Sequence, residues 1–208
     1  STTEQWAGAA IAGPKSRDML SKLYPDLDVS NDALPFMGYK EAEFFGVPSR
    51  IFRISFSGEL AYEINVKSDH GMFMWEKMME VGKEFGNQPY GTEALSTLRI
   101  EMGHVAGPEL DGRTIPSDVS LNGLVSKKKD FIGKNSLGRE AFNLESRQKI
   151  VGLIPIDRKS SIPEGSHIVQ DQNAKLPNPK LGHVSSSCWS VENNNPFSLA
   201  IMKDGKNM

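Results

Sequence analysis

The chain has 208 residues, which is enough for one large domain or two modest ones. Its composition, 38% hydrophobic and 24% charged, is typical of a folded globular protein and excludes a disordered one. The net charge of -2 argues against a general nucleic-acid binder, and no run approaches the roughly 18 apolar residues that cross a bilayer. Cys188 is the single cysteine, so no internal disulfide can form, and we expect a cytoplasmic protein.

The sequence at both ends is typical of a segment taken from a longer protein. Ser1-Thr2-Thr3 has no starting Met and no signal pattern, and the chain then runs at once into an apolar stretch over 6–12 that suits a buried strand. Residues 203–208 are typical of a hairpin turn, but no strand follows them. We therefore expect both ends to be truncations.

Three helices are expected in the first half of the chain. Gly13-Pro14 predicts a helix over 15–23, because proline favours the first helical position. Asp69 can cap a helix from about 70 to 85 that Gly86 closes, and Thr92 can cap another over 93–102. We expect Met72, Trp75, Met79 and their neighbours to form the apolar stripe of the longer helix, which is more typical of a core than of a cofactor site.

Residues 52–66 predict a β-hairpin. Phe52, Ile54 and Phe56 alternate with polar residues, Ser57-Gly58-Glu59 has the chemistry of a turn, and apolar residues alternate again from Leu60 to Val66. One face of this hairpin is apolar, and Glu63 stands on the other. From the pattern alone, a solvated surface glutamate is the simplest interpretation.

The last third of the chain predicts a second domain. Residues 107–134 are loop-rich, and Ser136 can start a short helix through Phe142. Short β runs over 150–154, 166–169, 181–184 and 198–201 are separated by turns and prolines, which is typical of a small antiparallel barrel or sandwich. We expect a boundary near residue 146, with domains over 1–146 and 147–208.

The hairpin resembles the folate-binding motif of the glycine-cleavage T-protein (aminomethyltransferase) superfamily. Phe56, Ser57, Gly58, Glu59 and Glu63 sit at the offsets of that motif. The resemblance implies an N-terminally truncated, folate-binding α+β domain followed by a C-terminally truncated small antiparallel β-barrel, with Glu63 as the folate-binding glutamate. A pterin presents a ring N–H beside an exocyclic amino group, and a carboxylate can accept hydrogen bonds from both.

Further segments extend the resemblance over nearly the whole chain. They are Ile11 to Ser16, Leu98 to Gly103, Lys128 to Lys134 and Leu181 to Ser186. Within the superfamily, the sequence of these segments is most similar to the carboxy-terminal part of the alpha subunits of heterotetrameric sarcosine oxidases. That likeness implies an enzyme in which the methylene group of oxidised sarcosine passes to tetrahydrofolate, giving 5,10-methylenetetrahydrofolate. It also implies other oxidase subunits as partners, and FAD, FMN, NAD and zinc elsewhere in the complete enzyme.

Two departures from the T-protein pattern bear on the chemistry. Leu95 stands where the T-protein has an arginine before its Leu-Arg-x-Glu helix motif, which favours the sarcosine oxidase branch. The catalytic aspartate of the family lies upstream of the strand over 7–12, so we expect no catalytic residue within this chain. Two alternatives stay open: a stand-alone aminomethyltransferase or folate-dependent demethylase, and a non-catalytic folate-fold module kept for assembly.

Four residues are candidates for folate binding: Glu63, Phe56, Tyr62 and Lys128. Phe56 could stack on the pterin or belong to the core, and Tyr62 suits packing better than binding. Lys128, within the basic run Lys127 to Lys129, could attract the glutamate tail of folate or simply be solvated. No metal site is expected, because the four histidines share no ligand spacing with one another or with Cys188.

Overall fold

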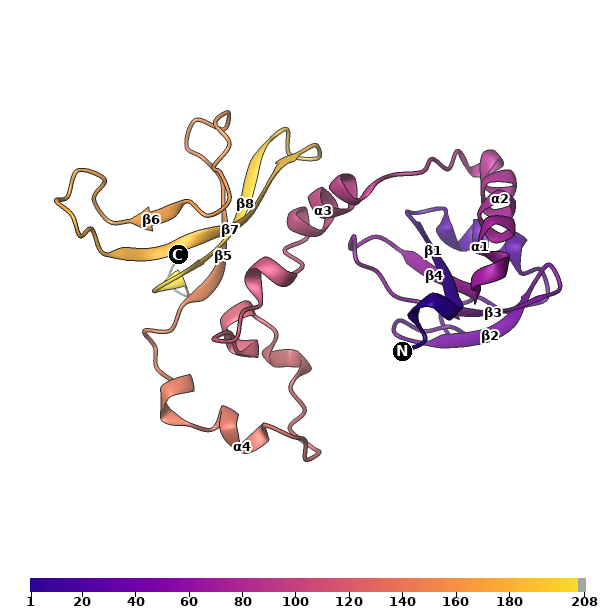
Figure 1. The fold of residues 1–208 in the computed structure, drawn as a ribbon, viewed down its shortest axis with the longest axis horizontal. Coiled ribbons are helices and arrows are strands. Elements are labelled where there is room, and N and C mark those ends of the chain that lie inside the picture. Colours follow the sequence, from indigo (N-terminus) through magenta and orange to yellow (C-terminus); the bar gives the residue numbers. More distant parts are fainter. Residues whose placement is uncertain (206–208) are drawn as a thin grey trace. The chain divides into compact units, whose positions relative to one another are not determined.

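The computed structural model describes residues 1–205 of the chain. These fall into two compact units, one over Ser1–Leu95 and one from Ser96 onward. Both units combine helices with antiparallel strands, which confirms the α+β class (Figure 1).

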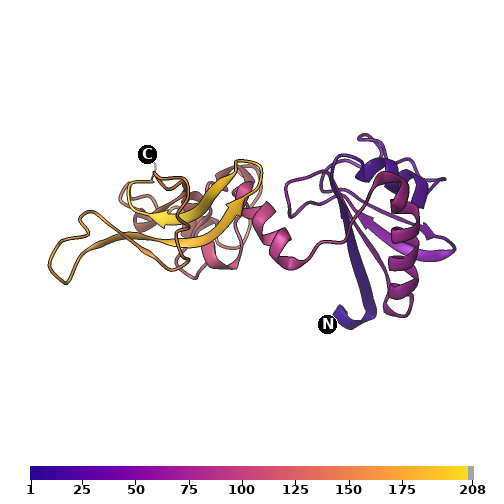
Figure 2. The same cartoon turned by 90° about the horizontal axis from the view of Figure 1, so that it is seen from above.

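The first unit is a four-stranded antiparallel sheet with helices on one face. Its spatial order is β1-β4-β3-β2. The elements are β1 (Trp6–Ala12), α1 (Ser16–Leu23), β2 (Tyr39–Phe44), β3 (Val47–Phe52), β4 (Ala61–Lys67) and α2 (Gly71–Gly82). Both helices pack on the same face of the sheet, and the core lies between them and the strands (Figures 1 and 2). The opposite face of the sheet carries no helix of this unit.

The sequence pattern predicted most of these elements. The apolar strand over 6–12 and the helix over 15–23 are confirmed, and Gly13 joins them with a φ of 118° that favours glycine. β2 was not predicted, because its outward residues are Tyr39, Glu41 and Glu43, and Lys40 stands beside Ala42 and Phe44 among its inward ones. An edge strand with a charged outer face does not have the apolar run of a central strand.

The predicted apolar stripe of α2 is wrong for two of its named residues, Met72 and Trp75. Met74 and Met78 enter the core, at 2% and 4% exposure, whereas Met72 is 70% exposed and Trp75 is 43% exposed. This helix has apolar side chains around more than one face, so periodicity alone could not select the buried one. Asp69 does not cap the helix either, because it lies within a 3-10 turn that precedes it. Gly86 ends this segment in the left-handed conformation, as expected.

The second unit contains a separate antiparallel sheet of order β5-β8-β7-β6. Its elements are most of α3 (Thr92–Glu101), α4 (Lys134–Leu137), β5 (Lys149–Leu153), β6 (His167–Val169), β7 (Lys180–Ser190) and β8 (Asn195–Met202). Between α3 and β5 the chain forms loops and short 3-10 turns, as the sequence predicted. The helix expected over 136–142 is α4 followed by a 3-10 turn over Glu140–Phe142.

The predicted barrel is wrong. The four strands form an open sheet in which β5 pairs with β8 and β6 pairs with β7, and no pairing joins β5 to β6 within residues 1–205. β6 has only three residues, and its register shifts between Ile168 and Val169. Closure needs a continuous stagger around all strands, which four strands with a short, irregular edge do not provide. The boundary near residue 146 falls just before β5 and stays a prediction.

Candidate folate-binding face of the first sheet

The turn between β3 and β4 is fixed to the start of α1. β3 ends at Phe52, so the strand predicted through Ile54 and Phe56 is wrong, and residues 53–60 form an irregular loop. Phe52 faces Glu63 in the register and therefore lies on the polar face, not on the predicted apolar one. The Leu60 carbonyl accepts hydrogen bonds from the Gly13 backbone N–H, at 2.9 Å, and from the Ser16 hydroxyl, at 2.8 Å. Gly58 has a φ of 84°, the left-handed conformation that the predicted turn required.

β4 presents its side chains alternately to the two faces of the sheet. Tyr62, Ile64 and Val66 are fully buried under the helices, whereas Glu63 and Asn65 are half-buried on the opposite face. This confirms the predicted alternation and the position of Glu63 on the polar face. It also separates two of the candidate residues, because Tyr62 and Glu63 point to opposite sides of the sheet.

Tyr62 has the surroundings of a core residue. Its ring is 0% exposed, and its hydroxyl has no hydrogen-bond partner within the described residues. Burial raises the pKa of the Tyr62 phenol, and the charges of Arg17 and Arg53 offset part of this effect. Arg17 lies 5.7 Å from the ring centroid. A neutral, enclosed phenol of this kind suits packing.

Small residues surround Glu63 on the side of β1. In the strand register Glu63 faces Ala10 of β1 and Phe52 of β3, and Asn65 faces Gly8 of β1. Residues 8, 10 and 12 of β1 share this face, and none has a side chain larger than a methyl group. The surface beside Glu63 is therefore low and accessible to a flat ligand.

Aromatic rings border this low surface along the sheet. On the β2 and β3 side, the rings of Phe52 and Tyr39 stack with centroids 5.8 Å apart. Farther along β4, the Arg50 guanidinium lies 4.3 Å from the Trp6 ring centroid, and the two come from strands on either side of Asn65. Glu63 thus lies between the small residues of β1 and the aromatic side chain of Phe52 on β3. Aromatic and carboxylate groups together are the chemistry that a pterin needs.

The Glu63 carboxylate is held by its neighbour on the same strand. The Asn65 side-chain amide donates a hydrogen bond to Glu63 Oε1 at 3.2 Å. No basic side chain of residues 1–205 lies within ion-pair distance of Glu63. Hydrogen-bonding capacity of the carboxylate therefore stays open to a ligand with two donors.

A cavity of about 650 Å³ lies beside β1 in the same unit. It is lined by β1 itself, by Trp75, Met78 and Met79 of α2, and by the segment over 85–92. Ala10, the partner of Glu63 in the register, belongs to the lining, but Glu63 does not. Trp75 and Met79 of the predicted stripe therefore face this cavity, and no sequence signal distinguished that role from core packing.

The other two candidate residues lie on loops. Phe56 is 45% exposed in the loop that follows β3, so it is not a core residue. Lys128 is exposed and belongs to the second unit, where its backbone N–H donates to the Ser126 hydroxyl at 3.3 Å.

The second unit encloses a buried ion pair between Arg99 and Glu109. Arg99 Nη1 donates to Glu109 Oε2 at 2.8 Å, and Arg99 Nη2 donates to the Ser186 hydroxyl at 2.7 Å. The Ser186 hydroxyl donates to Glu109 Oε1 at 2.6 Å. Burial raises the pKa of Glu109, but hydrogen bonds from Ser186 and from the Ala106 backbone, with the charge of Arg99, leave it below its usual value. A closed network of this kind has a structural role.

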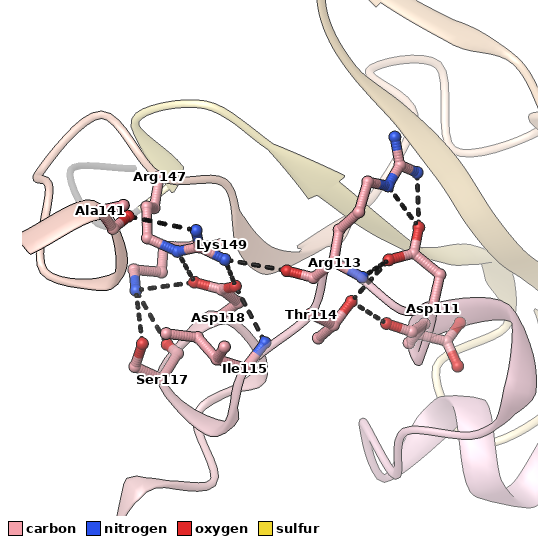
Figure 3. Close-up of polar contacts among 10 residues, drawn as sticks. Asp111, Arg113, Thr114, Ile115, Ser117, Asp118, Ala141, Arg147 and Lys149 are labelled. Atoms are coloured by element: carbon pink, nitrogen blue, oxygen red, sulfur yellow. Dashed lines mark hydrogen bonds and ion pairs between the residues drawn. The ribbon is translucent and has the colours of Figure 1, made fainter. Parts of the chain in front are cut away.

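A second network ties the loops of this unit to β5 (Figure 3). Asp118 is 4% exposed and accepts hydrogen bonds from Arg147 through both of its oxygens. The Ile115 backbone N–H donates to Asp118 Oδ2 at 3.1 Å, and Lys149 Nζ lies 3.4 Å from Oδ1. Arg147 and Lys149 lie 29 and 31 residues from Asp118 in the sequence, so no local motif could have revealed these two partners.

Two kinds of feature are absent from residues 1–205. No group of three or more His, Cys, Asp or Glu side chains could hold a metal ion. No helix is both long enough and apolar enough to cross a bilayer.

The chain matches the model of the GCVT N-terminal domain over residues 1–129. It is 42% identical over its full length to the sarcosine oxidase subunit alpha of Rhizobium meliloti (strain 1021), and it covers 21% of that protein. The sarcosine oxidase subunit alpha of Corynebacterium sp. (strain P-1) is 43% identical over 99% of this chain, which covers 22% of it. The chain thus spans about a fifth of the length of these relatives.

Aminomethyltransferases are also similar. The enzyme of Chloroherpeton thalassium is 32% identical over 93% of this chain, which covers 51% of it. Among solved structures, the glycine cleavage system aminomethyltransferase T from Bartonella henselae matches with a TM-score of 0.76 at 23% identity. That match covers 95% of this chain and 52% of the other, and it shows a common fold.

Proposed function

Because this chain belongs to the GCVT N-terminal domain family, we propose that it holds tetrahydrofolate within a longer protein of the sarcosine oxidase alpha type. In that protein the methylene group of oxidised sarcosine would pass to tetrahydrofolate, giving 5,10-methylenetetrahydrofolate. The identity of 42–43% to sarcosine oxidase subunits, against 32% to the aminomethyltransferase of Chloroherpeton thalassium, favours this branch.

One observation supports the site more than any other. The Glu63 carboxylate is half-buried on the face of the first sheet opposite α1 and α2, hydrogen-bonded to Asn65 and bordered by glycine and alanine on β1. A carboxylate so held can accept two parallel N–H donors from the edge of a flat heterocycle, which is the pattern that a pterin presents. Phe52 and Tyr39 offer aromatic surface on the other side.

Glu63 would contribute binding and orientation, and no residue of this chain is assigned to proton transfer. Bound there, tetrahydrofolate supplies the amine nitrogens that accept the methylene group. A fixed pterin holds these nitrogens at a constant position relative to Glu63, and proximity of this kind is itself a large part of the catalysis of group transfer. We do not assign FAD, FMN, NAD or zinc to any residue of this chain.

The proposal is tested by titrating folinic acid, a stable reduced folate, into the full-length protein by isothermal calorimetry. Glu63→Gln keeps the size of the side chain but removes its charge and one acceptor. Hydrogen bonds to charged groups contribute about 1.5–3 kcal/mol, so affinity should fall about tenfold to a hundredfold. Glu43→Gln, on the same face at the far end of β2, is the matched control and should bind as the parent does. Equal affinity of the parent and Glu63→Gln would remove Glu63 from the site.

Two other functions are distinguished by simple observations on the full-length protein. A sarcosine oxidase should co-purify with flavin-bearing partners and be yellow, whereas a stand-alone aminomethyltransferase should be colourless. A non-catalytic assembly module would form no methylenetetrahydrofolate when sarcosine and tetrahydrofolate are supplied to the complete assembly.

A further inference from the structure

Asn65 and Glu63 form a pair on the same face of β4. They are two residues apart, which places both side chains on one side of a strand, and both are half-buried. Their contact of 3.2 Å joins the Asn65 amide nitrogen to only one carboxylate oxygen, Oε1. The amide thus restricts the rotation of the carboxylate and leaves Oε2 without this restraint.

Gly8 provides the space in which the Asn65 amide lies. It stands opposite Asn65 in the register of β1 and β4. A Cβ atom at position 8 would lie 2.9 Å from Asn65 Oδ1, closer than real Cβ contacts, and 3.8 Å from Glu63 Oε1. Gly8 is not among the glycines with positive φ, so backbone conformation is not the reason for glycine here. The reason is the room that the Asn65 side chain occupies.

We propose that Asn65, seated over Gly8, is a positioning residue that orients Glu63 for the paired N–H donors of a pterin. This inference rests on the proposed function of Glu63. A carboxylate that is already oriented loses less rotational freedom when the ligand binds, and both of its oxygens can meet the two donors at once. Asn65 acts through Glu63 and need not touch the ligand.

The proposal makes a specific claim about coupling. If Asn65 acts only through the Glu63 carboxylate, its removal should matter only while that carboxylate is present. A residue that merely supports the fold would lower affinity by the same factor whatever stands at position 63. A double-mutant cycle separates these two cases.

The cycle uses the full-length protein with folinic acid as the probe in isothermal calorimetry. Asn65→Ala should weaken binding about threefold to tenfold in the parent, and less than twofold in the Glu63→Gln background. Gly8→Ala, which displaces the amide instead of deleting it, should reproduce both results. Lys67→Ala is the matched control and should bind as the parent does. Lys67 follows Asn65 on the same face of β4, at the end of the strand farther from Glu63.

Each outcome bears on the proposal. An equal loss in both backgrounds, or no loss in the parent while Glu63→Gln binds weakly, would overturn the role of Asn65 and leave the proposed function intact. No effect of Glu63→Gln itself would overturn both. Because Asn65 is only half-buried, its alanine variant should fold even if Gly8→Ala does not, and circular dichroism checks this for every variant.

Discussion

At the residue scale, two carboxylates of this molecule differ in how many hydrogen-bond donors they already have. Glu63 is half-buried with one amide donor, so it keeps hydrogen-bonding capacity for a ligand. Glu109 is 1% exposed, and donors from Arg99, Ser186 and the Ala106 backbone occupy both of its oxygens. Full satisfaction of a buried carboxylate is typical of structural networks, and spare capacity is typical of binding sites.

Glu109→Gln should destabilise the second unit strongly. The substitution leaves the Arg99 guanidinium buried without a counter-charge, and breaking a buried ion pair costs about 3–5 kcal/mol. Hydrogen–deuterium exchange of the full-length protein should then show α3 and β7 peptides exchanging about a hundredfold to a thousandfold faster. Glu145→Gln, an exposed control in the same unit, should exchange as the parent does. Unchanged protection in Glu109→Gln would mean that the pair adds nothing to stability.

Some positions of individual side chains could be predicted from the sequence, and others could not. Alternation along residues 60–66 placed Glu63 and Tyr62 on opposite faces correctly, because a strand has a fixed period of two. It could not show that Gly8 shares space with Asn65 and Glu63, because Gly8 lies on another strand, far from both along the chain. Ser186 is likewise brought to Arg99 only by the tertiary fold.

At the element scale, one buried carboxylate connects segments that have little regular structure. Asp118 joins the 3-10 turn over Pro116–Val119 to Arg147 and to Lys149 at the start of β5 (Figure 3). Burial alone raises the pKa of Asp118, but the hydrogen bonds from Arg147 and Ile115 and the charges of Arg147 and Lys149 lower it below the usual value. The charged form therefore stabilises the folded state.

The stability of these loops should depend on pH in a defined direction. A carboxyl group with a lowered folded pKa stabilises the protein above its unfolded pKa, about 3.9 for aspartate, and this contribution disappears as the pH falls through the lower folded pKa. Hydrogen exchange of peptides over 113–149, corrected for intrinsic rates, should show protection that declines below about pH 4. Asp118→Asn should lose much of this protection already at pH 7. Its remaining protection should no longer decline as the pH falls below about 4. Equal protection of Asp118→Asn and the parent at pH 7 would contradict this account.

Element types were easier to predict than their buried faces. β4 and the helices followed from alternation and from capping glycines such as Gly86, both of which are local signals, whereas the first arm of the hairpin was predicted too late in the sequence. The face of α2 was wrong because Met72, Met74, Trp75 and Met78 are all apolar, and only the packing of the first sheet decides which of them enter the core. β2 was missed because charged residues occur on both of its faces.

At the scale of the whole molecule, the chain is an α+β segment that matches about a fifth of its sarcosine oxidase relatives. The α+β class and the family likeness could be predicted from ordered motifs along nearly the full chain, and the comparisons confirm both. The barrel could not be judged correctly, because four short strands at regular spacing fit an open sheet as well as a closed one. Strand pairing is a long-range property, and spacing in the sequence does not contain it.

The most direct test of the central claim compares the affinities of two ligands, in the parent and in the Glu63→Gln variant. If Glu63 accepts hydrogen bonds from the ring N–H and the exocyclic amino group together, a folate analogue without that amino group should bind the full-length parent at least tenfold more weakly than folinic acid. In Glu63→Gln this ratio should shrink to about twofold or less, since the paired acceptor is gone. A preference for folinic acid that is the same in the parent and in Glu63→Gln would contradict the claim that this carboxylate recognises the pterin.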